Sequence, residues 1–380
     1  MAAQGLFGAT AGDGLSRQKS LWSVVHIDPW LLLLLLALVS GGLFVLYSGA
    51  DRNMAVVEAQ GIRFGVAFAV MLVFAQLDPA VYRRWAPWLF LAGLAALIAV
   101  LLVGVGAKGA QRWLALPGLP RFQPSEFMKL VVPMMAAWYL SRHYLPPGVK
   151  KVAVALAIVL VPMVMIGLQP DLGTALLVGS AGLFVVFFAG ISWKLISAFF
   201  GLVAIAAPLM WFFGMREYQK QRVLTLLDPQ SDPLGAGWNI IQSTTAIGSG
   251  GMEGKGWLQG TQSHLEFLPE SHTDFIVAVL AEEFGFVGVM LLLAVYLLII
   301  LRCLFIASTA QDSFSRLLAG ALTMTFFIYI FVNVGMVSGL LPVVGVPLPL
   351  ISYGGTSVVT LMAAFGVLMS IHTHRRMIGA

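Results

Sequence analysis

The chain has 380 residues, of which 59% are hydrophobic and only 10% are charged. Soluble globular domains carry roughly a quarter charged residues, so this composition excludes an ordinary water-soluble enzyme, and its richness in apolar residues excludes a disordered chain. The single cysteine, Cys303, excludes an intramolecular disulfide and a cysteine metal cage. The formal charge of +5 is not gathered in a basic run, so it does not indicate nucleic-acid binding.

Ten apolar segments are long enough to suggest membrane spans, since a helix needs about 20 mostly apolar residues to cross a bilayer. Strand-like alternation is absent, so we expect an all-α polytopic membrane protein with ten transmembrane helices. The predicted spans are residues 30–47, 62–77, 86–106, 125–140, 152–168, 173–190, 194–214, 275–301, 317–338 and 352–371. We interpret the first as a retained helix, because its apolar stretch is too long for a cleaved signal.

Basic residues determine the predicted orientation, because short cytoplasmic segments of membrane proteins are enriched in Lys and Arg. An even number of spans puts both termini on one side, and a cytoplasmic N-terminus leaves most basic residues inside. Those residues are Arg17, Lys19, Arg83, Arg84, Arg142, Lys150, Lys151, Lys194, Arg302, Arg316, Arg375 and Arg376. We therefore expect both termini to be cytoplasmic, with residues 1–27 as a tail and 28–376 as one ten-helix domain. A large extracytoplasmic loop, 215–274, then joins helices 7 and 8.

Charged and aromatic residues surround the start of the fourth span. Lys108, Arg112 and Trp113 suit an anionic headgroup, although a tryptophan at this depth is equally common as an interfacial anchor. Glu126 and Lys129 are three residues apart and therefore share one face of a helix. A charged pair just inside a span is costly unless it faces protein or water. We expect either a structural ion pair or a polar floor beneath a substrate groove.

The long loop 215–274 ends in a cluster of titratable residues: His264, Glu266, Glu270, His272 and Asp274. The two histidines are eight residues apart and no H-E-x-x-H occurs, so we do not expect a metal held by protein ligands alone. Thr273 or Asp274 either caps the helix that follows or presents a reactive group at the depth of lipid headgroups. Two glycine-rich stretches earlier in the loop, 248–251 and 254–256, fail the Walker spacing. We interpret them as flexible backbone near the membrane surface.

Further polar residues lie within or between the predicted spans. Glu282 and Glu283 follow Asp274 by about two helical turns, and at least one should face the protein interior. Small residues at four-residue spacing in 333–339 favour close helix contact, and 341–357 is predicted to be a turn that re-enters the membrane. His372 and His374 are expected to be interfacial and not catalytic.

Four segments together resemble the SEDS family (shape, elongation, division and sporulation proteins), and the resemblance covers nearly the whole chain. They are Phe122-Gln123-Pro124-Ser125-Glu126, Gln169-Pro170-Asp171-Leu172-Gly173-Thr174, Leu268-Pro269-Glu270-Ser271-His272-Thr273-Asp274-Phe275, and Gly345-Val346-Pro347-Leu348-Pro349 with Ser352-Tyr353-Gly354-Gly355. Each segment alone is a weak signal, but four in order on a ten-span background are specific. Residues 259–262 and 333–337 are more similar to the elongation member of the family than to the division member. Ser271 departs from the Ala, Arg or Lys often seen there.

The resemblance implies a peptidoglycan glycosyltransferase of the bacterial inner (cytoplasmic) membrane that acts during cell elongation. Its substrate would be lipid II, a disaccharide-peptide on an undecaprenyl diphosphate carrier, polymerised on the periplasmic side. The implied partners are a class B penicillin-binding protein, which crosslinks the strands, and membrane lipid, but no nucleic acid. Asp274 corresponds to the essential acid of the family.

The implied reaction converts an α-linked donor into a β-linked product, which indicates a single inverting displacement with a general base. Asp274 is the predicted base. Lys108, Arg112, Lys129 and Arg222 are the predicted cations for the leaving diphosphate, a task that a bound divalent cation would also perform. Glu126 would orient Lys129, and Trp113 and His272 complete the predicted substrate-binding residues.

Two other functions stay open on the sequence. Ten spans with internal charges and broken helices also suit a transporter that moves lipid II across the membrane. The third possible function is that of a non-catalytic scaffold for the penicillin-binding protein.

Overall fold

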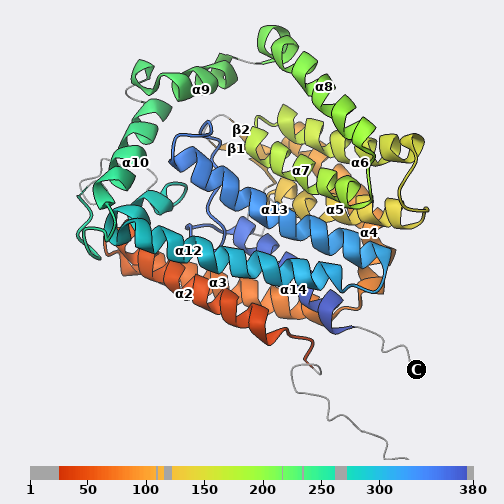
Figure 1. Ribbon diagram of the computed structural model, residues 1–380, viewed down its shortest axis with the longest axis horizontal. Coiled ribbons are helices and arrows are strands. Elements are labelled where there is room, and N and C mark those ends of the chain that lie inside the picture. The colour runs from red at the N-terminus through yellow and green to blue at the C-terminus, as the bar shows by residue number, and fades with distance from the viewer. Residues whose placement is uncertain are drawn as a thin grey trace, which may run out of the picture.

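Helices make up almost all regular structure in the chain, as a computed structural model shows (Figure 1). The structure describes residues 25–107, 110–114, 122–215, 217–232, 235–261 and 272–374. The helices are α2 (Pro29–Gly49), α3 (Met54–Gln76), α4 (Pro79–Val103), α5 (Pro124–Ser141), α6 (Val149–Leu168), α7 (Leu172–Phe188), α8 (Trp193–Leu209), η1 (Met210–Gly214), α9 (Glu217–Leu227), η2 (Pro229–Ser231), α10 (Ala236–Gly250), α12 (Ile276–Ser308), α13 (Ser313–Val337) and α14 (Thr356–Thr373). A mostly helical fold is therefore confirmed.

Each predicted span coincides with a helix, and eight helices of the described chain are long and apolar enough to cross a membrane. Of the other two, α7 is apolar but shorter, and α5 carries the Glu126–Lys129 pair. The largest differences are at the starts of α3 and α4, which begin at Met54 and Pro79 and not at residues 62 and 86, and at the end of α12, which extends to Ser308 and not to 301. The side chains of Asn53 and Asp78 cap α3 and α4 and allow the earlier starts.

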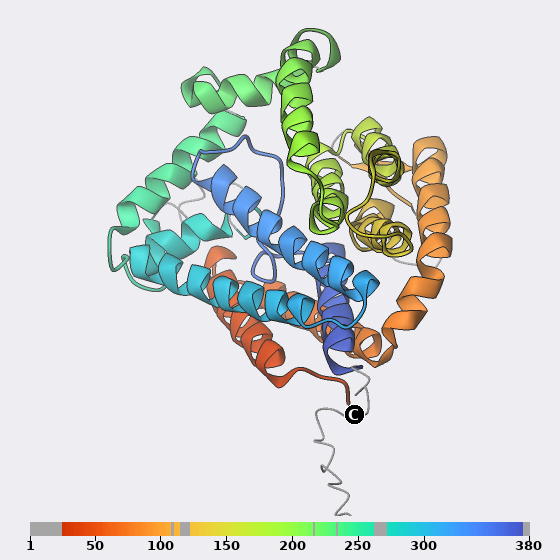
Figure 2. The same ribbon diagram turned by 45° about the vertical axis from the view of Figure 1, so that its right-hand side comes forward.

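The bundle is built around α13, which packs against α5, α7 and α12, while α14 packs along α3 (Figures 1 and 2). Asp274 lies at one end of the bundle, where α3, α5 and α14 begin. His374 lies at the opposite end, where α14 stops and α2 begins. We refer to these as the Asp274 end and the His374 end.

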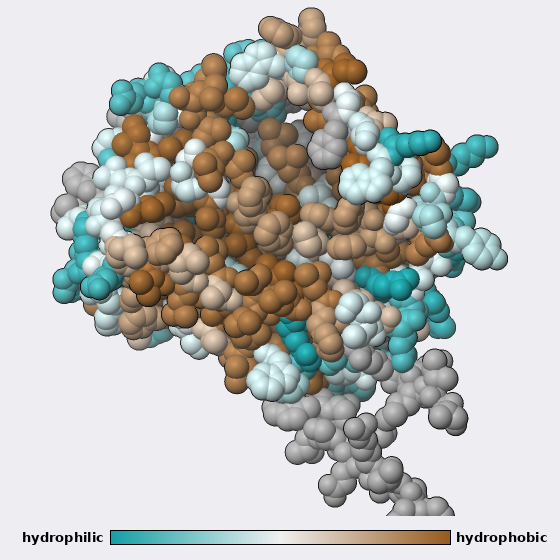
Figure 3. All heavy atoms as spheres, in the orientation of Figure 1, coloured by the Kyte–Doolittle hydropathy of each residue, from teal (hydrophilic) through white to brown (hydrophobic). Residues whose placement is uncertain are grey.

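Burial differs greatly between helices. About two thirds of α13 is buried, whereas no described residue of the apolar span Trp193–Gly214 is buried. Figure 3 shows hydrophobic residues over much of one face of the molecule, and large apolar side chains such as Leu102 and Phe213 are exposed. Such a surface is expected where the solvent is lipid and not water.

A small β-hairpin occupies part of the loop predicted at 107–124. Strand β1 (Val105–Ala107) pairs antiparallel with β2 (Ala110–Trp113), and an isolated bridge joins Leu114 to Phe122. The loop is therefore partly ordered as a sheet, which the sequence analysis did not predict. The hairpin leads the chain from the end of α4 to the start of α5.

The glycine-rich stretches belong to regular or hydrogen-bonded backbone: residues 248–250 end α10, and residues 251–256 contact α12. Helix α12 is interrupted at Gly285, which has a φ of 64°, and residues 251–256 take over backbone hydrogen bonds at this break. The N–H groups of Phe286 and Val287 donate to the carbonyls of Gly251 and Met252 at 2.9 and 3.1 Å. A Cβ on Gly254 would collide with the backbone of α12, which explains the need for glycine there.

Candidate active site

Asp274 lies in a turn just before α12 and is half-buried. The N-cap position of α12 is occupied by Phe275, whose side chain makes no capping hydrogen bond. The backbone carbonyl of Asp274 accepts a 2.9 Å hydrogen bond from the side-chain amide of Asn333, and the same amide donates to the carbonyl of Val346 at 2.7 Å. Asn333 thus ties Asp274 to α13 and to the segment that follows it.

Residues 338–355 form the loop that covers Asp274. Its middle is buried, as expected for a chain that turns back into the bundle, and Tyr296 donates a hydrogen bond to the carbonyl of Pro349 at 2.7 Å. Gly345 lies beside the Asp274 carboxylate, since an added Cβ would lie 3.5 Å from Oδ2, which is an ordinary van der Waals contact. The backbone N–H of Tyr353 donates to the carbonyl of His272 at 2.9 Å.

His272 is half-buried, and its ring meets the ring of Tyr353 edge-on at 5.8 Å. The structure therefore places this predicted substrate-binding residue beside the loop and close to Asp274 in the chain. His264, Glu266 and Glu270 lie outside the described residues.

Glu126 and Lys129 form an ion pair on the first turns of α5. The ammonium of Lys129 lies 2.6 Å from Oε1 of Glu126 and 4.9 Å from the centre of the Tyr329 ring. Both charged residues are buried, with 7% and 6% of their surfaces exposed. Within the described chain, Oε2 of Glu126 has no hydrogen-bond partner. The predicted Glu126–Lys129 ion pair is therefore present, and Oε2 of Glu126 can still accept a hydrogen bond from another group.

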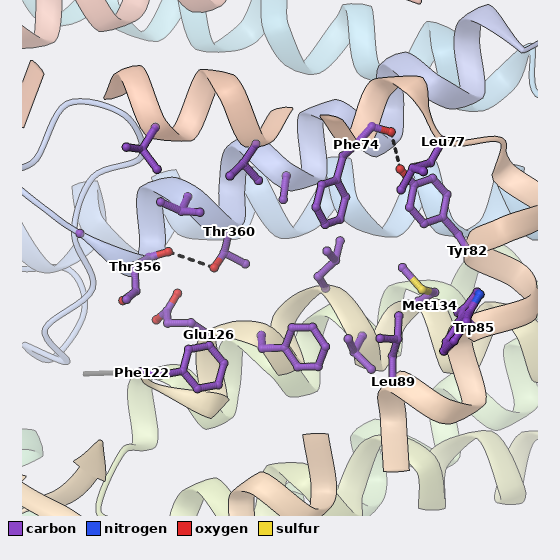
Figure 4. Close-up of a pocket in the computed structure, with 18 of the residues that line it drawn as sticks. Phe74, Leu77, Tyr82, Trp85, Leu89, Phe122, Glu126, Met134, Thr356 and Thr360 are labelled. Atoms are coloured by element: carbon purple, nitrogen blue, oxygen red, sulfur yellow. Dashed lines mark hydrogen bonds between the residues drawn. The ribbon is translucent and has the colours of Figure 1, made fainter. Parts of the chain in front are cut away.

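An apolar groove of about 760 Å³ runs between α3, α4, α5 and α14 (Figure 4). Its charged lining residues are Arg63 and Glu126, and Figure 4 shows Glu126 pointing from α5 toward Thr356 on α14. At the other end of the groove lie Tyr82 and Trp85. Lining side chains such as Ile62 and Trp85 are 71% and 54% exposed, so the groove is open at its side.

The predicted phosphate-binding cations do not meet at one place. Arg112, on β2, donates to the carbonyl of Pro170, and its Nε lies 3.8 Å from Oδ2 of Asp171. It therefore already has protein partners. Arg222 lies on α9, which packs mainly against α10 and η2 and not against the helices of the groove. Lys108 lies outside the described residues, and Trp113 ends β2 half-buried.

The prediction that Glu282 or Glu283 faces the protein interior is confirmed, because both are fully buried. The ammonium of Lys255 lies 2.8 Å from Oε1 of Glu282. Oε1 of Glu283 accepts hydrogen bonds from the hydroxyl of Ser48 and from the backbone N–H of Leu258. These acids join α2, the segment 251–261 and the first part of α12.

Two residues of this region were missed by the sequence analysis. Arg63 was placed at the edge of a span because the start of α3 was predicted too late. Asn333 was interpreted only as part of a small-residue packing motif. A polar amide inside an apolar span is itself a signal of a buried, specifically bonded side chain, and that signal was present.

The described residues contain no group of three or more His, Cys, Asp or Glu side chains that could hold a metal ion. Oε2 of Glu126 fits a supporting ligand for a divalent cation that is bound chiefly by substrate phosphates, which is the usual mode of Mg²⁺.

The chain is similar to proteins of cell-wall synthesis. It is 53% identical to the peptidoglycan glycosyltransferase MrdB of Escherichia coli over 361 residues, which is 95% of this chain and 97% of MrdB. The structure resembles a chain of a peptidoglycan synthase complex described as coordinating polymerization and crosslinking, with a TM-score of 0.81, 31% identity, and coverage of 92% and 98%. It also resembles the rod shape determining protein RodA of Thermus thermophilus, with a TM-score of 0.68, 29% identity, and coverage of 91% and 96%.

The family match spans the whole described bundle, from residue 24 to residue 377. It agrees with the apolar helices in indicating a multi-pass membrane protein, and it confirms the family resemblance derived from the four sequence segments. This chain belongs to the FtsW/RodA/SpoVE family of cell cycle proteins.

Proposed function

We propose that this protein is a peptidoglycan glycosyltransferase that polymerises lipid II on the periplasmic side of the bacterial inner membrane during cell elongation. The predicted enzyme class is supported by the identity to MrdB over nearly the full length of both chains. The observation that carries the proposal is that an apolar groove ends beside the loop that covers Asp274. Arg63 lines the groove and stacks on Tyr353, whose backbone binds His272, two residues from Asp274.

The groove suits the polyprenyl tail of such a substrate. Its lining is apolar except at the end that holds Arg63 and Glu126, and it is open at the side. A lipid tail would lie along the apolar part, so its diphosphate would reach the charged end. This arrangement brings the sugar next to the diphosphate toward the loop 338–355 and Asp274.

Asp274 is the proposed general base. The acceptor hydroxyl gives its proton to the carboxylate as its oxygen attacks the anomeric carbon, and the bond from that carbon to the diphosphate breaks. The displacement inverts the configuration, so it needs no covalent enzyme intermediate. The Asn333 amide keeps Asp274 at a defined position, because it holds the backbone carbonyl of that residue.

The diphosphate leaves with an additional negative charge, which cations must stabilise. Lys108, Arg112, Lys129 and Arg222 stay candidates, with Glu126 orienting Lys129 and Trp113 and His272 contacting the substrate. A divalent cation bound to the diphosphate would supply further positive charge, with Glu126 as its supporting protein ligand.

The proposed topology has ten spans, residues 28–376 as one membrane domain, and a cytoplasmic tail of residues 1–27. Both termini are cytoplasmic, and the loop 215–274 between the seventh and eighth spans is periplasmic. The eight apolar helices, the helical α5 and α7, and the basic residues of the short loops support this arrangement. The proposed partner is a class B penicillin-binding protein, since a similar chain occurs in a peptidoglycan synthase complex.

The test is reconstitution of the purified protein in vesicles with labelled lipid II. The wild-type protein should form glycan polymer, and Asp274→Asn should lower the rate about 10²- to 10⁴-fold, the usual contribution of a general base. The folded state, followed by the thermal midpoint, should be unchanged. Lipid II that crosses the membrane without polymer would support a transporter, and polymer made equally well by Asp274→Asn would exclude this base.

A further inference from the structure

Arg63 is the cation that lines the groove within the described chain. It lies nine residues after Met54, the start of α3, which places it about 14 Å along the helix. Arg63 is half-buried on an apolar helix, where a charged side chain is costly unless it is paired or used. The partners of Arg63 therefore decide its role.

Within the described chain, the partners of Arg63 carry no negative charge. One guanidinium nitrogen donates to the side-chain oxygen of Gln60 at 3.3 Å, and the guanidinium carbon lies 4.2 Å above the centre of the Tyr353 ring. In the part of the chain that the structure describes, no carboxylate lies within 4.0 Å of Arg63. A guanidinium has five N–H donors, so most of them stay available.

The cations predicted from the sequence are bound differently. Lys129 is paired with Glu126 at 2.6 Å, and Arg112 contacts Pro170 and Asp171. Their positive charges are thus partly or wholly compensated before any substrate binds. Arg63 differs because its contacts are a neutral amide and an aromatic ring.

The guanidinium of Arg63 is held in place by groups that also belong to the active site. Gln60 is fully buried, its side-chain oxygen accepts a hydrogen bond from the N–H of Gly354 at 3.3 Å, and its amide donates to the carbonyl of Ser352 at 3.5 Å. Tyr353 lies between Ser352 and Gly354 in the chain, and its ring lies under the guanidinium of Arg63. An arginine stacked on a ring still presents its N–H groups in the plane of the guanidinium, which suits two-point binding of a phosphate.

We propose that Arg63 binds the diphosphate of the lipid-linked substrate while the tail occupies the groove, and that Gln60 is its positioning residue. The assignment rests on the proposed function and names the group that recognises the leaving diphosphate. As the bond from the anomeric carbon to the diphosphate oxygen breaks, the electron pair stays on that oxygen, next to Arg63. The proton of the acceptor hydroxyl goes to Asp274. The negative charge of Glu126, in the same groove, is offset by Lys129.

The experiment compares the binding of undecaprenyl diphosphate and uncharged undecaprenol to the purified full-length protein in detergent. Arg63→Gln should weaken diphosphate binding about 10- to 100-fold, the range for lost hydrogen bonds to a charged group, and leave undecaprenol binding unchanged. Arg63→Lys, which keeps the charge, should lose less. Arg52→Gln is the matched control, because Arg52 is an exposed arginine before α3 that does not line the groove, and it should behave as wild type.

Two outcomes would overturn the assignment. One is that Arg63→Gln binds the diphosphate as tightly as wild type. The other is that it loses undecaprenol and the diphosphate equally, which would mean that Arg63 only shapes the groove. The thermal midpoint of each variant separates both outcomes from misfolding, and Arg63→Lys replaces Arg63→Gln if the latter does not fold.

The same measurements distinguish a failure of the Arg63 assignment from a failure of the proposed function. A wild-type protein that forms polymer while Arg63→Gln keeps full diphosphate affinity refutes only the role of Arg63. A wild-type protein that forms no polymer, but whose diphosphate binding depends on Arg63, refutes only the glycosyltransferase.

Discussion

Charged side chains lie at both ends of the bundle. The hydrogen bonding of Asp28 is complete at one end, whereas that of Glu126 and Arg63 is incomplete at the other. At the His374 end, Asp28 is fully buried and both carboxylate oxygens are used. Oδ1 accepts from the backbone N–H groups of Trp30 and Leu31, and Oδ2 accepts from Nε and Nη2 of Arg302 at 2.9 and 2.7 Å. His372 lies beside the same oxygen at 3.6 Å. This cluster joins the start of α2 to the ends of α12 and α14.

At the Asp274 end, Glu126 keeps one carboxylate oxygen without a partner in the described chain, and Arg63 uses few of its donors. Both side chains line the groove. Since an unsatisfied buried charge destabilises a protein, such groups are expected where a ligand completes the bonding. We therefore expect the Asp28 cluster to hold the fold together, and Glu126 and Arg63 to bind substrate.

The largest effect is expected from Arg302→Met, which leaves the Asp28 carboxylate buried without its main partner. Loss of one member of a buried ion pair typically costs about 3–5 kcal/mol of unfolding free energy, so the thermal midpoint in detergent should fall strongly. The turnover of the molecules that remain folded should be unchanged.

The double variant Asp28→Asn/Arg302→Met is the control for this prediction. It removes both charges and should recover part of the lost stability. A drop in turnover per folded molecule, equal to that of active-site variants, would contradict the structural role of the His374 end.

Lys129→Met and Glu126→Gln test the other end and should have intermediate effects. Each removes a charge next to the groove, so glycan polymerisation should fall about 10-fold, in line with about 1.5 kcal/mol for a hydrogen bond to a charged group. Rates and thermal midpoints should be measured on the same preparations. Normal turnover combined with reduced stability would make this pair structural and would remove the difference between the two ends.

The smallest effect is expected from the pH response of His26. Its ring stacks on that of His374 at 3.8 Å, and burial, followed by the charge of His374, lowers the pKa of His26 below its ordinary value of 6.5. The unfolded chain therefore takes up the proton first as pH falls, so stability should decrease as pH drops through 6.5 and below. The effect is small because the ring is only partly buried.

His26→Phe should keep the stacking and lose this pH dependence. The check is the thermal midpoint of wild type and variant between about pH 8 and pH 5.5. An identical pH response of the two proteins would show that other groups of the His374 end dominate it.

The helical fold could be predicted from the sequence because long apolar segments carry their own signal. The start of α3 could not, because Glu58, Gln60 and Arg63 make residues 54–63 look like a loop. Gln60 is acceptable inside the helix only because it bonds to Ser352 and Gly354, almost 300 positions away in the chain. Local hydropathy contains no information on such a contact.

The site could be predicted in part, because some of its residues also carry a local signal in the sequence. Asp274, Glu126 and Lys129 stand in recognisable segments, and the burial of Glu282 and Glu283 follows from their position in a span. The groove depends on how α3, α4, α5 and α14 pack together, and the contacts of Gly254 with α12 depend on a helix break at Gly285. These are properties of the assembled bundle and have no periodic pattern in the sequence.

The lateral opening of the groove beside Ile62 and Trp85 has a kinetic consequence. A carrier lipid that enters between helices never has to pass through water, so the quantity that governs saturation is its mole fraction in the leaflet and not its molarity. Diluting the carrier with inert lipid should then slow polymerisation, while diluting the same vesicles in buffer should not. The polymerisation rate would therefore follow the surface density of the carrier lipid in the membrane.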